Sequence, residues 1–231
     1  MIVDRNLGVV ADWWFEDRRR FAFPTSRSEL QVLLKMCQSA AEVLEAHKLL
    51  KPSRIILSGW LRAEPDENNL VRVEEPDITI TILESTGSQE LLTQCEKTLD
   101  QLEQQRSFLY PTDVKILGVG VVLDANEQEY ELPDVSWLLG TTLDAHIVDV
   151  CTQSDAWLPY TLVAQPQIEV WKRNAPRLEA ALQEIEASLN VKPYTNSCSD
   201  YALINGFSLE NHTDADGEVL IVYGESDYRR I

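Results

Sequence analysis

The sequence predicts an α+β protein with a ferredoxin-like βαββαβ sandwich over residues 1–123. Between residues 26 and 49, apolar side chains recur every three or four positions, which is typical of a helix with one buried side. Residues 77–83 alternate isoleucine with threonine, which is the period of a half-buried strand. A second helical stripe and apolar strand follow at an offset of 59 residues, which aligns Pro52 with Pro111. Two successive βαβ units favour an antiparallel sheet with both helices on one face.

The first half contains six expected elements. They are strands at 7–15, 54–61, 77–83 and 114–123, and helices at 26–49 and 88–106. The helical stripes comprise Leu30, Leu33, Leu34, Cys37, Ala40, Ala41 and Leu44, then Leu92, Cys95, Leu99 and Leu102. Gly118 and Gly120 lie inside the last strand, with no third glycine and no helix after them. They therefore indicate close helix-to-sheet packing rather than a dinucleotide-binding loop.

Residues 124–231 are expected to form a second, closely packed α+β subdomain, unless the chain is one continuous domain. Short strands are expected at 130–132, 146–151 and 157–162, with a loop or short helix at 133–142. One or two helical turns at 166–173 precede a long helix that Asn174 can cap. A closing hairpin is expected from segments 201–209 and 218–223. Because no Gly/Ser/Pro-rich linker separates the halves, they are expected to pack intimately.

Composition indicates an ordinary globular protein. The chain has 231 residues, of which 44% are hydrophobic and 25% are charged. No segment approaches the roughly 20 uncharged apolar residues that a membrane-spanning helix needs, and the expected location is the cytoplasm of a bacterial-type cell. The four cysteines form no CxxC motif, so they are expected to be reduced, structural thiols that bind no metal.

Net charge is the strongest compositional signal. The formal net charge is −18, and residues 64–155 alone carry −16, with 20 acidic and 4 basic side chains. Such a field repels nucleic acid and anionic membranes and accelerates association with a basic protein. An acidic surface that only maintains solubility is the alternative interpretation.

Catalytic motifs are absent. The sequence has no G-x-S-x-G, no G-x-x-x-x-G-K and no H-E-x-x-H, and it contains only three histidines. We therefore expect no cofactor, no metal and no catalytic residue. The Arg18–Arg20 cluster is expected to neutralise the acidic middle of the chain rather than to bind phosphate.

The preferred interpretation is a non-enzymatic binding protein that caps a basic protein partner. In its acidity the chain resembles toxin-neutralising immunity proteins, although this resemblance is one of character and rests on no motif. Tryptophan is enriched at binding hot spots, and Trp14 and Trp60 alternate out of phase with their core-facing neighbours. The expected partner-binding residues are Trp14, Trp60, Glu74, Glu75 and Asp77.

The alternative is an enzyme or ligand-binding protein of unfamiliar type. Its pocket would lie between the two halves, around a histidine oriented by a carboxylate. The residues of this expected pocket are His146, Asp144, Asp149, Trp157 and Tyr160. The oligomeric state is left open by the sequence.

Overall fold

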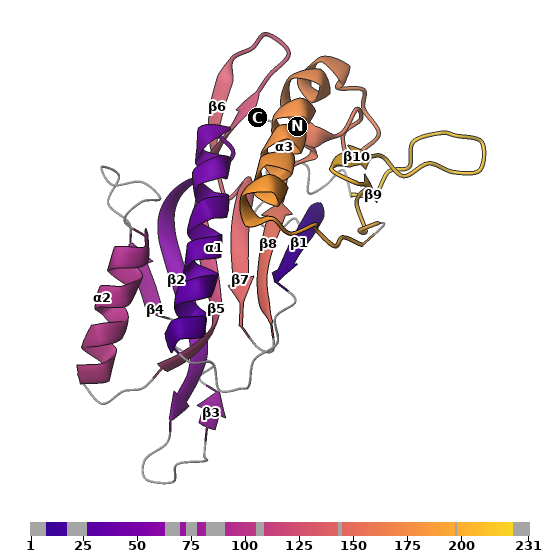
Figure 1. Ribbon diagram of the computed structural model, residues 1–231. Helices are drawn as coiled ribbons and strands as arrows, with labels where there is room; N and C mark the ends of the chain where they lie inside the picture. Colours follow the sequence, from indigo (N-terminus) through magenta and orange to yellow (C-terminus); the bar gives the residue numbers. More distant parts are fainter. Residues whose placement is uncertain are drawn as a thin grey trace.

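The chain folds into a mainly antiparallel sheet with helices on one side, as the computed structural model shows (Figure 1). The structure describes residues 8–17, 27–62, 70–72, 78–81, 91–104, 109–142, 145–196 and 198–223. The helices are α1 (Arg27–Ala46), α2 (Leu91–Gln104) and α3 (Ile168–Leu189). The strands are β1 (Ala11–Asp17), β2 (Lys51–Arg62), β3 (Leu70–Arg72), β4 (Ile78–Thr81), β5 (Leu109–Leu123), β6 (Glu129–Pro133), β7 (Ser136–Thr141), β8 (His146–Thr152), β9 (Leu203–Asn205) and β10 (Ser208–Glu210).

The main sheet has the strand order β1-β8-β7-β5-β2-β3. Strand β4 also pairs with β2, and β6 pairs with the end of β5, next to β7. Every pairing in this sheet is antiparallel. The α+β class predicted from the sequence is therefore confirmed.

The ferredoxin-like strand order is not found. That arrangement would join the four strands of residues 1–123 directly, but β1 pairs with β8 and is separated from β5 by β7 and β8. The reason is that β7 and β8, from residues 136–152, pair along both of their edges inside the sheet. The sheet is thus continuous across position 123, where the sequence suggested a division.

The helices cover a single face of the sheet, as expected for α1 and α2 (Figure 1). Helix α1 lies over β2, β7 and β8 and contacts both α2 and α3. Its expected stripe is entirely buried. Across the interface, the core-facing strand residues include Trp13, Phe15, Ile55, Ile116 and Val148, each with no solvent exposure.

Residues 133–142 and 157–162 were assigned wrongly from the sequence. The first segment is mostly strand β7 rather than a loop or short helix, and its alternating burial matches that of a strand between two neighbours. The second begins within a short 3₁₀ helix (Asp155–Trp157) and continues as turns. There the Ser154 side chain accepts a hydrogen bond from the Ala156 N–H, so local polar contacts replace a strand.

Helix α3 is one continuous helix, and Asn174 does not cap it. The Asn174 side chain instead pairs with the backbone of Leu123 at the end of β5: Nδ2 donates to the Leu123 carbonyl (2.8 Å) and Oδ1 accepts from its N–H (2.9 Å). The same Nδ2 donates to the Val170 carbonyl (2.8 Å). Asn174 is fully buried, so these bonds explain how a polar amide is accommodated inside the core.

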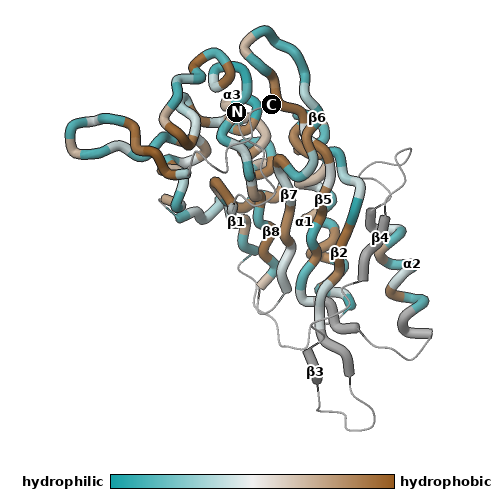
Figure 2. The backbone as a smooth tube through the Cα atoms, turned by 180° about the vertical axis from the view of Figure 1, so that it is seen from behind, coloured by the Kyte–Doolittle hydropathy of each residue, from teal (hydrophilic) through white to brown (hydrophobic). Residues whose placement is uncertain are grey.

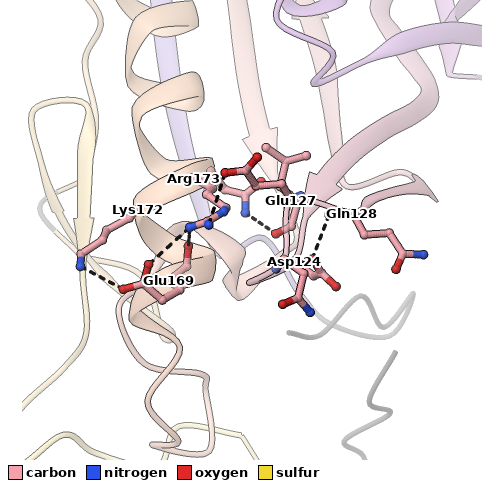
Figure 3. Close-up of polar contacts among 9 residues, drawn as sticks. Asp124, Glu127, Gln128, Glu169, Lys172 and Arg173 are labelled. Carbon is pink, nitrogen blue, oxygen red and sulfur yellow. Dashed lines mark hydrogen bonds and ion pairs between the residues drawn. The ribbon is translucent and has the colours of Figure 1, made fainter.

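The β5–β6 turn is tied to α3 by an ion pair (Figure 3). Asp124 accepts hydrogen bonds from the Gln128 and Asn126 N–H groups, which close the turn and lower the pKa of the Asp124 carboxyl. Arg173 on α3 pairs with Glu127 in the turn and with Glu169 one helical turn away (both 3.4 Å). Such exposed pairs contribute little to stability, so their main consequence is local charge neutralisation.

The C-terminal part contains a smaller hairpin than expected. Strands β9 and β10 pair with each other around Gly206, within the segment expected as a single strand. The turn at 214–217 is present, but it is bounded only by an isolated bridge between Thr213 and Val219. The segment returns to the core through Val222, whose N–H donates to the Leu162 carbonyl (2.9 Å).

Candidate functional site: the helix-free face of the sheet

The side of the sheet opposite the helices is the strongest candidate site. Seen from behind, β1, β8, β7, β5 and β2 lie in front of α1, and no described helix crosses them (Figure 2). Because side chains alternate along a strand, every second residue points to this side. We define the open face as Asp12, Trp14 and Glu16 of β1; Ile147, Asp149 and Cys151 of β8; Trp137, Leu139 and Thr141 of β7; Asp113, Lys115 and Leu117 of β5; and Arg54, Ile56 and Ser58 of β2.

Cross-strand register arranges the open face in rows. One row runs from Trp14 through Asp149, Leu139 and Lys115 to Ile56, each residue lying opposite the next. An adjacent row begins with Asp12 opposite Cys151 and Trp137, and ends with Leu117 opposite Arg54. Acidic side chains of these two rows therefore lie on β1 and β8, and basic side chains lie on β5 and β2.

Asp149 is the most unusual group on the open face. Its Oδ1 atom is buried without a hydrogen-bond partner among the described residues. Burial, followed by repulsion from Asp12, raises the pKa of the Asp149 carboxyl from 3.8 to about 7, although hydrogen bonds from Cys151 and Trp14 act in the opposite direction. Near neutral pH this carboxyl group is therefore poised between its charged and neutral forms.

Trp14 provides an aromatic platform beside these carboxylates. Its ring lies 5.6 Å from that of Tyr194, centroid to centroid, and the two residues exchange backbone hydrogen bonds (2.8 Å each). Tyr194 is 60% exposed, so the platform is accessible from the edge of the sheet. The expectation that Trp14 faces away from the helices is thus met: it lies opposite Asp149, and Trp13 occupies the core.

A hollow of about 340 Å³ lies on the basic side of the open face. The Lys115 ammonium lies 4.2 Å from the ring centroid of Trp137 within it, a cation–π contact. Neither Lys115 nor Arg54 forms an ion pair with another described residue. The remaining lining residues are Leu117, Asp134 and Gln153. The sequence did not predict this hollow, because residues 133–142 were expected to form a loop or short helix rather than a strand that carries Trp137.

The pocket expected around His146 is not assembled. His146 points to the helical side, where its Nε2 lies 3.1 Å from Glu29 of α1, whereas Asp149 belongs to the open face. Trp157 is buried in the core and donates to the Thr152 hydroxyl. Tyr160 pairs through its backbone with the Asn211 side chain (3.0 and 2.9 Å). Asp144 lies outside the described residues.

Most of the expected partner-binding residues cannot be placed. Glu74, Glu75 and Asp77 lie outside the described residues, and for Trp60 the structure describes only the backbone, which pairs with Tyr110 and Arg72.

Several carboxylates of the acidic middle region are neutralised by cations from other parts of the chain. Lys48 pairs with Glu129 (2.7 Å) and Arg27 with Asp100 (2.6 Å), in addition to the Arg173–Glu127 pair. On the open face, Asp12 and Asp149 have no such cation among the described residues. Within the described part of the chain, these two carboxyl groups of the open face are therefore not neutralised by an ion pair with a cation.

The cysteines give a direct test of the burial pattern. Cys37 and Cys95 are fully buried, as expected, and burial raises the pKa of each thiol to about 12. Burial also raises the pKa of Cys151, whereas Cys198 is exposed. Because the thiolate is the reactive form, a maleimide should label only Cys198 in the native protein and all four thiols after denaturation. Native labelling of a Cys198→Ser variant at any other cysteine would contradict this assignment.

Comparison with known proteins gives no relatives: no family model, curated protein or solved structure matches the chain. Within the described ranges, no three histidine, cysteine, aspartate or glutamate side chains converge on a possible metal position. Among the described helices, none is both long and apolar enough to cross a membrane.

Proposed function

We propose that the protein is a non-enzymatic binding protein that caps a basic protein partner through its open face. Trp14 acts as the anchor of this contact, and Asp12, Glu16 and Asp149 receive cationic side chains of the partner. Glu74, Glu75 and Asp77 contribute to the approach of the partner through the long-range field of the acidic middle region.

The observation that carries this proposal is the row of contacts around Trp14. A half-buried tryptophan packed against an exposed tyrosine, next to Asp12 and Asp149, which form no ion pair with a described residue, combines an apolar anchor with electrostatic selectivity. Binding hot spots typically have this composition, a large aromatic group within a charged rim. Arginine is the expected cation, because its planar guanidinium both stacks on aromatic rings and pairs with carboxylates.

The test is affinity capture from extracts of the source cell, followed by kinetic measurements on the captured protein. The wild-type chain should retain a basic protein, and association should slow as salt is raised, because exposed charges are screened over about 8 Å. Trp14→Ala should weaken binding about 30-fold, mainly through faster dissociation. Lysine substitutions at Glu74, Glu75 and Asp77 should mainly slow association.

A matched control is Glu179→Gln, an exposed residue of α3 on the helical side of the molecule. It should leave capture unchanged, and thermal melting should confirm that every variant is folded. Equal retention of the same basic protein by wild type and Trp14→Ala would contradict a docking site on the open face. Capture of no basic protein at all would contradict the function itself.

A further inference from the structure

We propose that two copies of this chain pair face to face through the open face, related by a two-fold axis that runs along β7. This inference uses the same surface as the proposed function, but it does not depend on the basic partner. When that partner is absent, a second copy of the chain covers the open face.

The five strands that carry the open face lie symmetrically about β7. In the sheet order β1-β8-β7-β5-β2-β3, β1 and β8 lie on one side of β7 and β5 and β2 on the other, while β3 and β4 pair with the outer edge of β2, beyond the open face. A two-fold axis parallel to β7, above the open face, places β1 over β2 of the second copy and β8 over β5 of the second copy. Such an axis keeps each position at its own level along the strands, so each cross-strand row lies over the same row of the other copy.

Charges are complementary under this operation. Asp12 lies over Arg54 of the partner subunit in one row, and Asp149 lies over Lys115 of the partner subunit in the next. Because the interface is isologous, each of these contacts occurs twice. Aligned sheets pack about 10 Å apart, a separation that an aspartate and a long basic side chain can bridge.

A third row of the open face, beside the row of Trp14, places no two like charges of the two copies opposite each other. Glu16 lies at the level of Ile147, Thr141 and Asp113, and Asp113 lies next to Ser58. The operation places Glu16 over the partner's Ser58 and Asp113 over the partner's Ile147. Neither carboxylate therefore faces a carboxylate of the other copy.

Of the three open-face residues on the axis, Trp137 and Leu139 are apolar, and Thr141 lies at one end. Trp137 and Leu139 of β7 each lie over their own copies, so that the centre of the contact is aromatic and aliphatic while the charged groups flank it. This distribution, with an apolar centre and polar groups around it, is typical of protein interfaces.

Pairing of two copies also brings opposite charges to side chains of the open face that form no ion pair within the described part of one chain. The buried Oδ1 of Asp149 has no hydrogen-bond partner among the described residues, and Lys115 and Arg54 have no carboxylate partner there. The second copy places Lys115 over the Asp149 carboxyl group and Asp12 over Arg54. The Asp149 carboxyl accepts hydrogen bonds from Cys151 and Trp14 but is largely desolvated, so a nearby cation stabilises its charged form and favours association.

The size of the contact predicts weak, reversible association. Five strands spaced about 4.8 Å apart, each about seven residues long, cover roughly 20 Å by 20 Å, so pairing would bury roughly 800–1,000 Å² in total. This area is at the low end for specific complexes. A basic partner that binds the same face with a stronger anchor would therefore displace the second copy, and self-pairing would protect the open face until that partner is present.

The experiment is a charge swap followed by sedimentation equilibrium from low to high micromolar concentration. Wild type should show a monomer–dimer equilibrium that weakens as salt is raised. Asp12→Arg and Arg54→Asp should each weaken dimerisation about tenfold or more, because each places like charges opposite one another. The double variant Asp12→Arg/Arg54→Asp should recover dimerisation, since the pair is restored with reversed polarity.

Two control variants carry the same charge changes on the helical side: Glu179→Arg on α3 and Lys97→Asp on α2, both exposed. They should dimerise like wild type. A monomer at every concentration, or a double variant no better than the single ones, would overturn the inference. Because these measurements use the purified chain alone, such a failure leaves the capture of a basic partner to be judged separately. Failed capture, in turn, leaves the dimer measurement valid.

Discussion

Between mildly acidic and mildly alkaline pH, the free energy of unfolding should depend much less on pH in an Asp149→Asn variant than in the wild type. The carboxyl of Asp149 has its pKa raised from 3.8 to about 7 in the folded chain, first by burial and then by Asp12. Between these two values the folded state binds more protons than the unfolded state. The free energy of unfolding of the wild type therefore falls as pH rises through this window, and the contribution levels off above about pH 7.

The expected size of this effect is large for a single side chain. Integration between the two pKa values gives a loss of about 4 kcal/mol, a substantial part of the stability of a typical domain. Asparagine keeps the shape of the side chain but cannot ionise. Relative to a fully protonated wild type, the variant should be more stable by about 1.5 kcal/mol near pH 5 and by about 4 kcal/mol near pH 8.

Urea denaturation across this pH range, at low protein concentration to keep the chain monomeric, measures the effect. The informative quantity is the difference between variant and wild type at each pH, because all other titrating groups cancel. Asp12→Asn removes the second cause of the raised pKa, so it should give a smaller change of the same sign. If the free energy of unfolding changed with pH in the same way in wild type and Asp149→Asn, Asp149 would not be desolvated as described.

The same titration should appear in self-association. Lys115 of the partner subunit would favour the charged form of Asp149, so dimerisation should strengthen as pH rises through about 7. The other charged or titratable groups around Asp149 are Asp12 and Glu16 on β1, Cys151 on β8 and Lys115 of its own chain. Asp149→Asn should remove this pH dependence.

Local periodicity predicted the elements that are amphipathic over a long span. The stripe of α1 could be found from sequence because seven apolar residues keep helical spacing over four turns. The two faces of β1 were likewise visible, since Trp13 and Trp14 must point to opposite sides. Strand β7 was missed because it is short, follows Pro133 and contains Gly140, features that weaken a strand signal. Strand β7 is extended because it pairs with β5 on one side and β8 on the other, and this pairing cannot be read from its own six residues.

The candidate site depended on information that a single strand does not contain. Which strand lies next to β1 is decided by non-local pairing, so the meeting of Trp14 with Asp149 could not be predicted. One error was avoidable. His146 and Asp149 are three positions apart in a strand, and an odd separation places two side chains on opposite faces. The pocket that combined them was therefore inconsistent with the strand predicted for the same residues.

Gly118→Ala should cost about 3 kcal/mol or more in the free energy of unfolding. A β carbon at this position would overlap with the carbonyl group of Lys51, at the start of β2. The sequence indicated close packing here, but the close neighbour is the backbone that follows α1 rather than a helix face. The same backbone approaches Gly120 through Leu49, and it is held by a hydrogen bond from the Val121 N–H to the Lys48 carbonyl (2.8 Å).

The overlap cannot be relieved by moving a flexible side chain, because the atoms involved belong to the backbone. Relief requires separating β2 from β5, which pair along ten positions at the centre of the sheet. Gly217→Ala is the matched control, since Gly217 has a φ of +85° and open space around it. It should cost only about 1 kcal/mol, through backbone conformation alone. Chemical denaturation of both variants measures the contrast, and equal losses at the two positions would contradict the close approach of the two strands.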